Sequence, residues 1–338
     1  MRAWTLIAHT DPHRAFALRE HPDPQPKPNQ VLIRCEGFGL NYADVMAARG
    51  LYREAPPLPS IIGYEAVGRV IAAGQEAPQD LIGKRVVAMT RFGGYAELAV
   101  TDHRACAVIP EELSIGTAAA LATQGATAWY AARVLCPLHA GERVLVHSAA
   151  GGVGHLIVQL AAKAGCEVFA IVGGAAKRQH TLSLGAAHAI DRRTGDYSTQ
   201  LRTLLGKRRL DASFNAVAGT SFKKDMQLLG SGGRLVLFGG AERGGLGAFG
   251  TLRFVWSMGA LLPIFLMMKS KSILGVNMLK LGDNRPDLMA HCFREAVAAQ
   301  AAGLISPHVH EVMPAERLPE AHALLASGST MGKVALAW

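Results

Sequence analysis

Hydrophobic and polar positions follow different periods in two regions of the chain. Up to about residue 110, short apolar runs such as residues 31–33 and 67–71 are bounded by glycine and proline, which is typical of strands. From about residue 115, helix-length stretches alternate with short buried runs. The first pattern predicts an antiparallel, barrel-like lobe, and the second predicts a parallel sheet with right-handed crossovers.

The second region contains six candidate strands. They are residues 144–146, 168–172, 187–190, 212–214, 235–238 and 273–276. Ser114 is a candidate cap for a helix that runs to Arg133. A helix near residues 287–302 and a final strand at residues 333–337 are expected to rejoin the first lobe.

Length and composition favour two folded domains. The 338 residues exceed what one hydrophobic core usually serves, and 50% hydrophobic against 18% charged residues excludes a disordered chain. Five scattered cysteines form no C-x-x-C pair, so neither a disulfide scaffold nor a cysteine-based zinc module is indicated. With no secretory segment recognised near the N-terminus, we expect a cytoplasmic protein.

The chain is basic, with 35 Lys and Arg against 26 Asp and Glu and a formal charge of +9. These cations are scattered singly or in short groups such as residues 207–209, without aromatic interleaving. Nucleic acid is therefore not an expected partner, and a solvated surface or an anionic small molecule is favoured.

Residues 254–268 form an uncharged apolar segment that contains Pro263. A membrane-spanning helix needs about 20 apolar residues, so this segment is short as well as broken by proline. Three interpretations stay open: a wall or lid of a substrate cleft, a contact between subunits, and a less favoured contact with a membrane surface.

The clearest chemical motif is a glycine-rich turn between the strand at 144–146 and an apolar helix at 156–164. Its spacing fits G-x-G-x-x-G with alanine first, which permits a tight turn and a close approach of the backbone to a diphosphate. The helix N-terminus then offers amide donors to the anion. The cofactor-binding residues predicted here are Ala149, Gly151, Gly152, Val153 and Gly154.

The end of the next strand indicates which dinucleotide binds. An NAD site usually has Asp or Glu there, whereas residues 173–178 contain no acid but include Gly173, Lys177 and Arg178. Arg192, just past the third strand, is expected to close the same pocket. The sequence therefore predicts NADPH, unless Lys177 and Arg178 are simply exposed residues of a helix.

Three blocks together resemble a known family. They are residues 39–52, residues 57–65 and the turn at 149–154, and the likeness continues to residues 332–336. The chain resembles the zinc-free medium-chain dehydrogenases/reductases of the quinone oxidoreductase group, which is zeta-crystallin-like, near the vesicle amine transport protein-like branch. The resemblance implies an α/β protein with a discontinuous GroES-like β-barrel catalytic domain (residues 1–122 and 266–338) and a Rossmann domain with a doubly wound parallel sheet (residues 123–265).

The resemblance also bears on metal chemistry. Zinc-dependent relatives carry Cys and His ligands in two of these blocks, where this sequence has Asn41 and Tyr64. Both are poor zinc ligands, and the four-cysteine structural zinc loop is missing, so no metal is expected. Conjugate reduction needs no Lewis acid, because the negative charge spreads onto a distal oxygen.

The expected activity is therefore hydride transfer from NADPH to quinones or α,β-unsaturated carbonyls. By resemblance, Asn41, Tyr42 and Tyr52 line the nicotinamide cleft, Tyr64 is a weaker candidate, and Asp44 is structural. Phe238 and Gly239 lie at the carboxyl end of a predicted strand and are expected to contact the nicotinamide amide, because open α/β sheets bind ligands at that edge. The remaining cofactor-binding residues expected are Thr127 and Lys333. A homodimer is a family expectation.

Two other functions stay open from the sequence. One is an enoyl-thioester reductase of a fatty-acid or polyketide pathway, which shares the hydride chemistry. The other is a non-catalytic NADPH-binding adaptor at a membrane surface.

Overall fold

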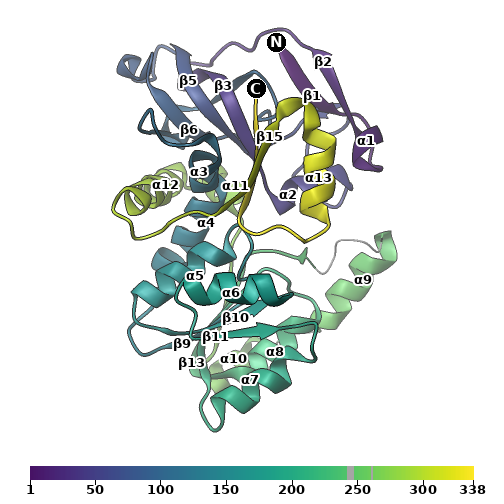
Figure 1. Cartoon of the computed structure of the whole chain (residues 1–338), viewed down its shortest axis with the longest axis vertical. Helices are drawn as coiled ribbons and strands as arrows, with labels where there is room; N and C mark the ends of the chain where they lie inside the picture. Colours follow the sequence, from purple (N-terminus) through teal and green to yellow (C-terminus); the bar gives the residue numbers. More distant parts are fainter. Residues whose placement is uncertain (242–246, 260–261) are drawn as a thin grey trace. The chain divides into compact units, whose positions relative to one another are not determined.

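A computed structural model describes residues 1–241, 247–259 and 262–338, and the chain forms two compact units (Figure 1). Unit 1 comprises Met1–Ala126 and Met278–Trp338, and unit 2 comprises Thr127–Asn277. The chain leaves unit 1 once and returns to it, which confirms the expected discontinuous arrangement. The α/β class with a GroES-like and a Rossmann part is confirmed as well.

Unit 1 is built mainly on a seven-stranded sheet. Its path is β15 (Val309–Pro314), β16 (Lys333–Ala337), β3 (Gln30–Leu40), β5 (Glu65–Ala73), β6 (Arg85–Met89) and β8 (Cys106–Val108), with β7 (Leu98–Asp102) also paired to β3. A small sheet joins β2 (Phe16–Glu20), β1 (Arg2–Leu6) and β4 (Ser60–Ile61). All pairs are antiparallel except β15 with β16.

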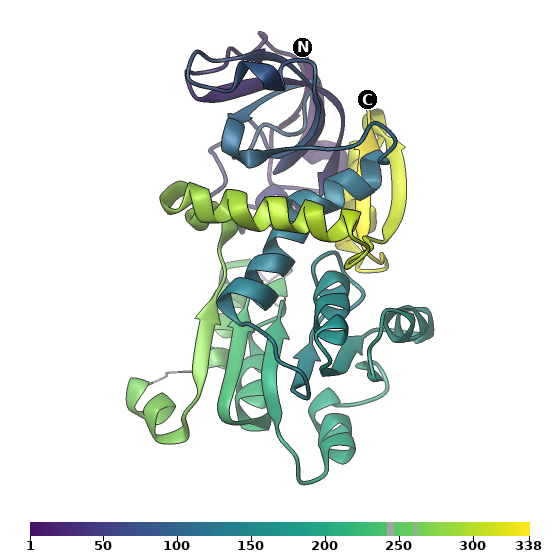
Figure 2. The same ribbon diagram turned by 90° about the vertical axis from the view of Figure 1, so that its left-hand side faces the viewer.

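The register of β16 on β3 positions one part of the site. Val334 lies opposite Leu40, so Lys333 comes beside the end of β3, where α2 (Tyr42–Ala48) follows at once. The other helices of unit 1 are α1 (Pro12–Ala15), α3 (Ile115–Ala120), α11 (Met278–Asn284), α12 (Pro286–Ala301) and α13 (Leu318–Ala326). Phe293 of α12 belongs to the same buried hydrophobic cluster as Ala118 and Ala119 of α3. The long α12 is the yellow-green helix of unit 1 in Figure 2.

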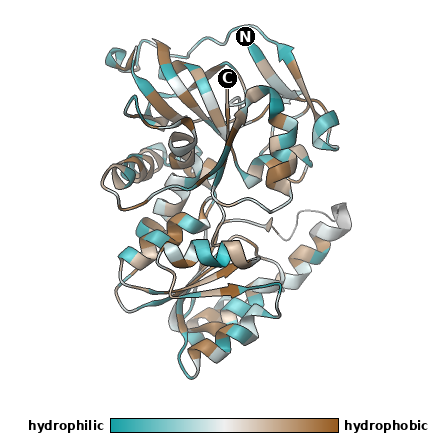
Figure 3. Ribbon diagram, in the orientation of Figure 1, coloured by the Kyte–Doolittle hydropathy of each residue, from teal (hydrophilic) through white to brown (hydrophobic). Residues whose placement is uncertain are grey.

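Unit 2 is built on a six-stranded, fully parallel sheet. In spatial order its strands are β11 (His188–Asp191), β10 (Glu167–Val172), β9 (Arg143–Val146), β12 (Leu210–Asn215), β13 (Leu229–Leu237) and β14 (Ser272–Gly275). The first strand, β9, lies beside the fourth, β12, as in the Rossmann fold. All six predicted strands are confirmed, and they are predominantly hydrophobic (Figure 3).

Helices connect these strands, as right-handed crossovers require. They are α5 (Gly154–Lys163), α6 (Ala175–Ser183), α7 (Tyr197–Leu205), α8 (Thr220–Leu228), α9 (Gly247–Met258) and α10 (Pro263–Lys269). The predicted cap is confirmed, because the Ser114 hydroxyl accepts a hydrogen bond from the Thr117 amide at 3.2 Å. The helix that follows is not uniform, since residues 121–125 and 130–135 form wider π-type turns around α4 (Ala126–Trp129).

The junctions of the two units differ from the domain boundaries expected from the sequence. The expected boundaries follow residues 122 and 265, whereas the compact units divide after Ala126 and Asn277. The second difference has a clear cause, since β14 pairs with β13 through four residues and so belongs to the Rossmann sheet.

Candidate active site

The glycine-rich turn lies between the end of β9 and the start of α5. The Gly151 amide donates to the Ser148 carbonyl at 2.8 Å, and the Ala149 amide donates to the Ile171 carbonyl of β10 at 3.1 Å. A Cβ on Gly154 would collide with the Ser148 carbonyl oxygen and lie 2.9 Å from the Ala149 Cα. The turn therefore requires glycine at position 154.

The N-terminus of α5 suits an anion. Val153, the residue before the helix, makes no side-chain cap, and the first turn of α5 carries no acidic residue. The positive end of the helix dipole is therefore not compensated by a side chain of the helix. Gly152 and Val153 are half-buried in the turn.

A cationic cluster lies at the carboxyl end of β10. The Arg193 guanidinium lies against the backbone there, 3.0 Å from where a Cβ on Gly174 would be, and Arg192 Nε lies 3.6 Å from the corresponding point on Gly173. Burial, followed by the positive charges of Arg193 and Arg192, lowers the pKa of Lys177. The structure thus brings the predicted Gly173, Lys177 and Arg192 together.

Arg193 and Asp191 belong to the same place and were missed by the sequence reasoning. The Asp191 carboxylate accepts hydrogen bonds from the Gly174 amide at 2.9 Å and the Arg193 amide at 3.0 Å. Both hydrogen bonds lower the pKa of Asp191, and the bond from the Arg193 amide has the larger effect. β10 itself ends without an acid as predicted, but the parallel register places Asp191 beside Val172, which the sequence spacing alone did not reveal.

The carboxyl ends of β12 and β13 also meet. The Phe238 amide donates to the Asn215 carbonyl at 3.2 Å, and a Cβ on Gly239 would lie 2.6 Å from the Ala216 carbonyl oxygen. Phe238 and Gly239 therefore lie at the predicted sheet edge. Thr127 is buried within α4, and its role stays a prediction.

A buried network not foreseen from the sequence joins the ends of β9 and β12. His147 Nε2 lies 2.9 Å from Asp225 Oδ2, and Tyr197, Ser213 and Asn215 donate to the same carboxylate at 2.7–2.9 Å. Burial acts to raise the pKa of Asp225, but His147 and these hydrogen bonds outweigh it and the pKa is lowered. The network fixes the two strands between which a Rossmann fold binds its dinucleotide.

A second buried cluster belongs to unit 1. Lys333 and Glu65 are both 0% exposed and form an ion pair, and the Lys333 ammonium also donates to Asn41 Oδ1 at 3.2 Å. The second Glu65 oxygen accepts from the Thr123 amide at 3.1 Å. A Cβ on Gly39 would collide with this pair, so a residue without a side chain makes room for it.

Asp44 adjoins this pair and is fully buried. Its Oδ2 accepts from the Asn41 amide at 2.7 Å, and its Oδ1 has no hydrogen-bond partner among the described residues. Burial, and to a smaller extent the charge of Glu65, raises the pKa of Asp44 to about 8. The hydrogen bond from the Asn41 amide and the charge of Lys333 act in the opposite direction but are outweighed. Asp44 therefore holds its proton more tightly than an exposed aspartate does, and it lies beside the ion pair of Glu65 and Lys333.

Two of the predicted tyrosines lie together near this cluster. The Tyr52 and Tyr64 rings meet edge-on at 6.0 Å, and Tyr64 packs on Phe92 at 5.2 Å. Burial raises the pKa of Tyr52 to about 12 and that of Tyr64 still further, so both keep their protons. The Tyr64 hydroxyl is buried without a hydrogen-bond partner among the described residues. The third tyrosine, Tyr42, is half-buried at the start of α2.

Unit 1 thus brings Asn41 and Lys333 together at Glu65, while Tyr64 packs with Tyr52 and Phe92. The prediction for Lys333 was a cofactor contact, but its ammonium is occupied by Glu65 and Asn41, and the side chain is fully buried. Direct binding of a coenzyme by Lys333 stays a prediction, and the geometry favours a positioning role. Within the described ranges, no group of three or more His, Cys, Asp or Glu side chains could hold a metal ion.

Comparisons with known proteins place the chain in a family. Residues 27–123 match the alcohol dehydrogenase GroES-like domain, and residues 152–295 match the zinc-binding dehydrogenase domain. The human synaptic vesicle membrane protein VAT-1 homolog is 30% identical over 319 residues, which cover 93% of this chain and 80% of the relative. The chain belongs to the medium-chain dehydrogenase/reductase family.

Two further proteins are similar to this chain, one over its whole length and one over part of it. The Escherichia coli quinone oxidoreductase, solved in complex with NADPH, is 26% identical with a TM-score of 0.87, and the match covers 100% of both chains. A phenolphthiocerol/phthiocerol polyketide synthase from Mycobacterium tuberculosis is 33% identical over 246 residues, which are 70% of this chain but 11% of the synthase chain. This protein is therefore an oxidoreductase of the medium-chain dehydrogenase/reductase family, in the quinone oxidoreductase group.

The apolar segment at residues 254–268 is mostly exposed where the structure describes it, with Phe254, Ser257, Met258 and Leu266 half-buried; residues 260 and 261 lie outside the described ranges. Val255, Trp256, Met267 and Met268 are 56–79% exposed. By length and composition, the 18 residues Leu252–Lys269, of mean hydropathy 1.4, are apolar enough to cross a membrane, and none of the described ones is buried. Length and composition alone do not assign a span.

Proposed function

We propose that this protein is an NADPH-dependent reductase that transfers hydride to quinones or α,β-unsaturated carbonyls without a catalytic metal. The observation that carries the proposal is the side-chain chemistry around Asn41 and Tyr64. At these two positions zinc-dependent relatives have metal ligands, whereas this chain has a buried amide and a neutral phenol, with Asp44, whose pKa is raised, bonded to the Asn41 amide. This set offers hydrogen-bond donors to a developing oxyanion in place of a Lewis acid.

The residues of unit 2 fit NADPH. The turn through Ala149, Gly151 and Gly154 suits a diphosphate at the α5 N-terminus, because that end of the helix has neither a side-chain cap nor an acidic residue in its first turn. Lys177, Arg192 and Arg193 supply the positive charge that a 2′-phosphate needs, and Asp191 is already engaged by backbone amides. Bound NADPH supplies the hydride.

The residues of unit 1 are proposed to hold the acceptor. Asn41, whose Oδ1 is fixed by Lys333, keeps its Nδ2 without a hydrogen-bond partner among the described residues. Tyr52 and Tyr64 stay protonated over the working pH range and so can donate to the acceptor oxygen. Tyr42 is a further lining candidate. In unit 2, Thr127, Phe238 and Gly239 are proposed to contact the nicotinamide end.

The direct test is NADPH oxidation with a panel of quinones and enones in the presence of a metal chelator. We expect turnover that survives chelation, and Tyr64→Phe should lower kcat without changing NADPH affinity. Flat traces for every acceptor, with NADPH demonstrably bound, would remove the proposed activity. Activity that depends on added zinc would remove the metal-free mechanism alone.

The similarity to part of a polyketide synthase favours a second candidate of the same chemistry, an enoyl-thioester reductase. The basic surface, with a formal charge of +9, would attract an acidic carrier protein. Acyl-carrier or coenzyme A enoyl thioesters should then give a higher kcat/KM than free quinones. The reverse order of kcat/KM would reject this candidate in favour of free acceptors.

The exposed α9 and α10 favour a third candidate, an NADPH-binding adaptor at a membrane surface. It requires binding to anionic liposomes that is lost when Trp256 and Met267 become serine, together with NADPH binding without turnover. The same apolar surface also suits a homodimer contact, which light scattering of the two variants would reveal. Turnover without liposome binding would leave the cytoplasmic reductase as the function.

A further inference from the structure

Among the described residues, four side chains converge on the carboxylate of Asp225, which lies in α8 and is 0% exposed. Ser213 and Asn215 of β12 donate to its Oδ2 at 2.9 and 2.7 Å, and the Tyr197 hydroxyl of α7 donates to its Oδ1 at 2.7 Å. His147 Nε2 lies 2.9 Å from Oδ2. Because hydrogen bonds to a buried carboxylate are strong and support one another, this group, the Asp225 network, is rigid.

His147 holds the chain just before the glycine-rich turn. Its amide donates to the Phe214 carbonyl of β12 at 2.9 Å, and the Ala149 amide donates to the Ile171 carbonyl of β10 at 3.1 Å. The chain is thus fixed to both neighbours of β9 over a short stretch. Ser148, between these two anchors, has a φ of +49°, in the left-handed region that serine rarely adopts.

The conformation of Ser148 shapes the glycine-rich turn. The Ser148 carbonyl accepts a hydrogen bond from the Gly151 amide at 2.8 Å. The same carbonyl oxygen lies 2.3 Å from where a Cβ on Gly154 would be. The turn therefore closes around this carbonyl, and its shape depends on the left-handed backbone of Ser148.

The same carboxylate acts on a second left-handed residue through Asn215. While Asn215 Nδ2 donates to Asp225, its Oδ1 accepts hydrogen bonds from the Val217 and Ala218 amides, both at 2.8 Å. Ala218 has a φ of +56°. The Asn215 carbonyl also accepts from the Phe238 amide at 3.2 Å, at the sheet edge where the nicotinamide is proposed to bind.

Left-handed residues other than glycine are uncommon, and unit 2 places two of them beside one network. In the part of unit 2 that the structure describes, the non-glycine residues with positive φ are Ser148, Ala218 and Ser270. Such conformations cost free energy and persist only where surrounding contacts hold them. For Ser148 and Ala218, those contacts lead through His147 and Asn215 to Asp225.

We propose that Asp225 is a positioning residue for the coenzyme. Through His147 it holds the glycine-rich turn, and through Asn215 it holds the strand end that meets the nicotinamide. Both turns stay in the conformations that NADPH requires, so binding does not have to form them. This inference rests on the proposed function, since it explains how the proposed NADPH groove keeps its shape.

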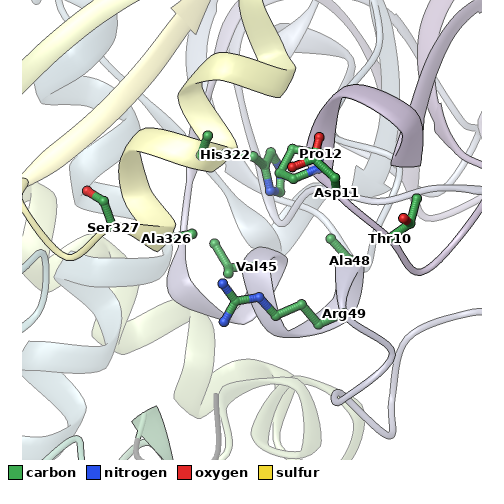
Figure 4. A pocket seen from close by; sticks show the side chains of 10 residues that line it. Thr10, Asp11, Pro12, Val45, Ala48, Arg49, His322, Ala326 and Ser327 are labelled. Atoms are coloured by element: carbon green, nitrogen blue, oxygen red, sulfur yellow. The ribbon is translucent and has the colours of Figure 1, made fainter. Parts of the chain in front are cut away.

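His322 of unit 1 provides a matched control. It is 1% exposed and lines a cavity of about 330 Å³ among α1, α2 and α13 (Figure 4). Its Nε2 lies 3.1 Å from the Tyr95 hydroxyl, and its ring packs on Phe16 at 4.5 Å. His322→Leu therefore removes a buried histidine that has no part in the Asp225 network, and NADPH affinity should stay unchanged.

The first arm of the test measures the glycine-rich turn by calorimetric titration with NADPH and with 2′-phospho-ADP-ribose, which has the diphosphate but no nicotinamide. His147→Leu should weaken both ligands equally, by roughly tenfold, because Ser148 is no longer held in its strained conformation. His147→Gln, which keeps an N–H for Asp225, should bind nearly as the wild type does. Adding Ser148→Gly to His147→Leu should recover most of the loss, since glycine adopts positive φ readily.

The second arm measures the nicotinamide end with the same two ligands. Asn215→Ala should weaken NADPH by roughly tenfold and leave 2′-phospho-ADP-ribose unchanged. Adding Ala218→Gly should recover most of this loss. Asp225→Asn, which sets an amide against the converging donors, should show the losses of both arms at once.

Urea unfolding of each variant ensures that folded proteins are compared, and the second arm decides if His147→Leu does not fold. Wild-type affinity in His147→Leu, or a loss that Ser148→Gly does not recover, would overturn the role of Asp225 at the glycine-rich turn. Unchanged NADPH binding in Asn215→Ala would overturn its role at the nicotinamide end. An equal loss in His322→Leu would show that any buried histidine has this effect, and would overturn the proposal.

The outcomes also separate this inference from the function on which it rests. A wild-type protein that binds NADPH but reduces no acceptor removes the proposed function, while the titrations still decide the role of Asp225. An active wild type with unchanged affinities in His147→Leu and Asn215→Ala rejects the inference and leaves the function standing.

Discussion

The two units hold charge in opposite ways. Unit 2 gathers Lys177, Arg192 and Arg193 at a strand end where Arg192 and Arg193 are exposed to solvent. Unit 1 buries Glu65 and Lys333 completely, pairs their opposite charges and places Asp44, whose pKa is raised, beside them. A binding site for an anion needs positive charge that a ligand can reach, whereas a site for hydride chemistry needs a dry interior in which weak hydrogen-bond donors act strongly.

The largest effect should come from the turn of unit 2. Gly154→Val places a side chain against the Ser148 carbonyl and the Ala149 Cα, so the turn must open and NADPH affinity should fall by at least roughly a hundredfold. Calorimetric titration measures this loss. Gly275→Ala is the matched control, because a Cβ there meets nothing within 4 Å and the binding should be unchanged. Unchanged affinity in Gly154→Val would place the diphosphate elsewhere.

The buried pair of unit 1 should give the next largest effect. Lys333→Met leaves Glu65 buried without its counter-charge, which costs about 3–5 kcal/mol of unfolding free energy in such sites. The double variant with Glu65→Gln should recover much of that loss, because no lone charge remains. Both are measured by urea unfolding.

The surface pair of unit 2 provides the contrast. Lys224 and Asp196 are 41% and 38% exposed, so Lys224→Met should cost no more than about 1 kcal/mol. If Lys333→Met proved equally mild, the ion pair of unit 1 would be open to solvent and the comparison between the units would fail.

The pH dependence of stability should have opposite signs in the two units. The pKa of Asp44 is raised to about 8, so the folded chain binds more protons than the unfolded chain between about pH 4 and pH 8. Unit 1 should therefore lose stability as the pH rises through that window. The pKa of Asp225 is lowered, so its contribution to unit 2 is present above about pH 4 and is lost as the pH falls.

Hydrogen exchange of peptides from each unit, corrected for intrinsic exchange rates, measures how the stability of each unit changes with pH. Asp44→Asn should reduce the loss of stability with rising pH in unit 1 alone. Asp225→Asn should reduce the loss of stability at acid pH in unit 2 alone. An Asp44→Asn protein whose unit 1 kept the wild-type slope would show that Asp44 is ionised at neutral pH.

The smallest effect concerns coenzyme choice. Lys177→Ala should weaken NADPH by roughly tenfold and NADH hardly at all, because only NADPH carries the 2′-phosphate. Arg178→Ala is the control, since the Arg178 guanidinium is engaged by the Ala189 carbonyl at 3.1 Å. Equal losses for both coenzymes in Lys177→Ala would show that the 2′-phosphate is held by other residues.

The nucleotide-binding unit was largely predictable because its features are local in the sequence. The strand, the turn at 149–154 and the helix are consecutive, and their spacing alone indicated the Rossmann crossover now seen between β9 and α5. Asp191 and Arg193 escaped the prediction because they come from the end of β11 and the turn after it, and only the parallel register brings them to Gly174.

The cluster of unit 1 was less predictable because its members are distant along the chain. Asn41 and Tyr64 were found by resemblance, but their link to Lys333 arises from the pairing of β16 with β3. Neither Tyr95 nor His322 lies in a motif, and their contact joins residues 227 positions apart. Periodicity predicts which positions are buried, and it does not predict which buried polar groups meet.

Following the hydride itself tests the central claim most directly. Wild-type protein treated with a metal chelator is given NADPH carrying deuterium at the transferred C4 position, together with an enone in ordinary water. We expect the reduced product to carry one deuterium at the β-carbon and one solvent proton at the α-carbon, at the same yield with and without chelator. Product without deuterium, or deuterium transfer only after zinc is restored, would contradict the account.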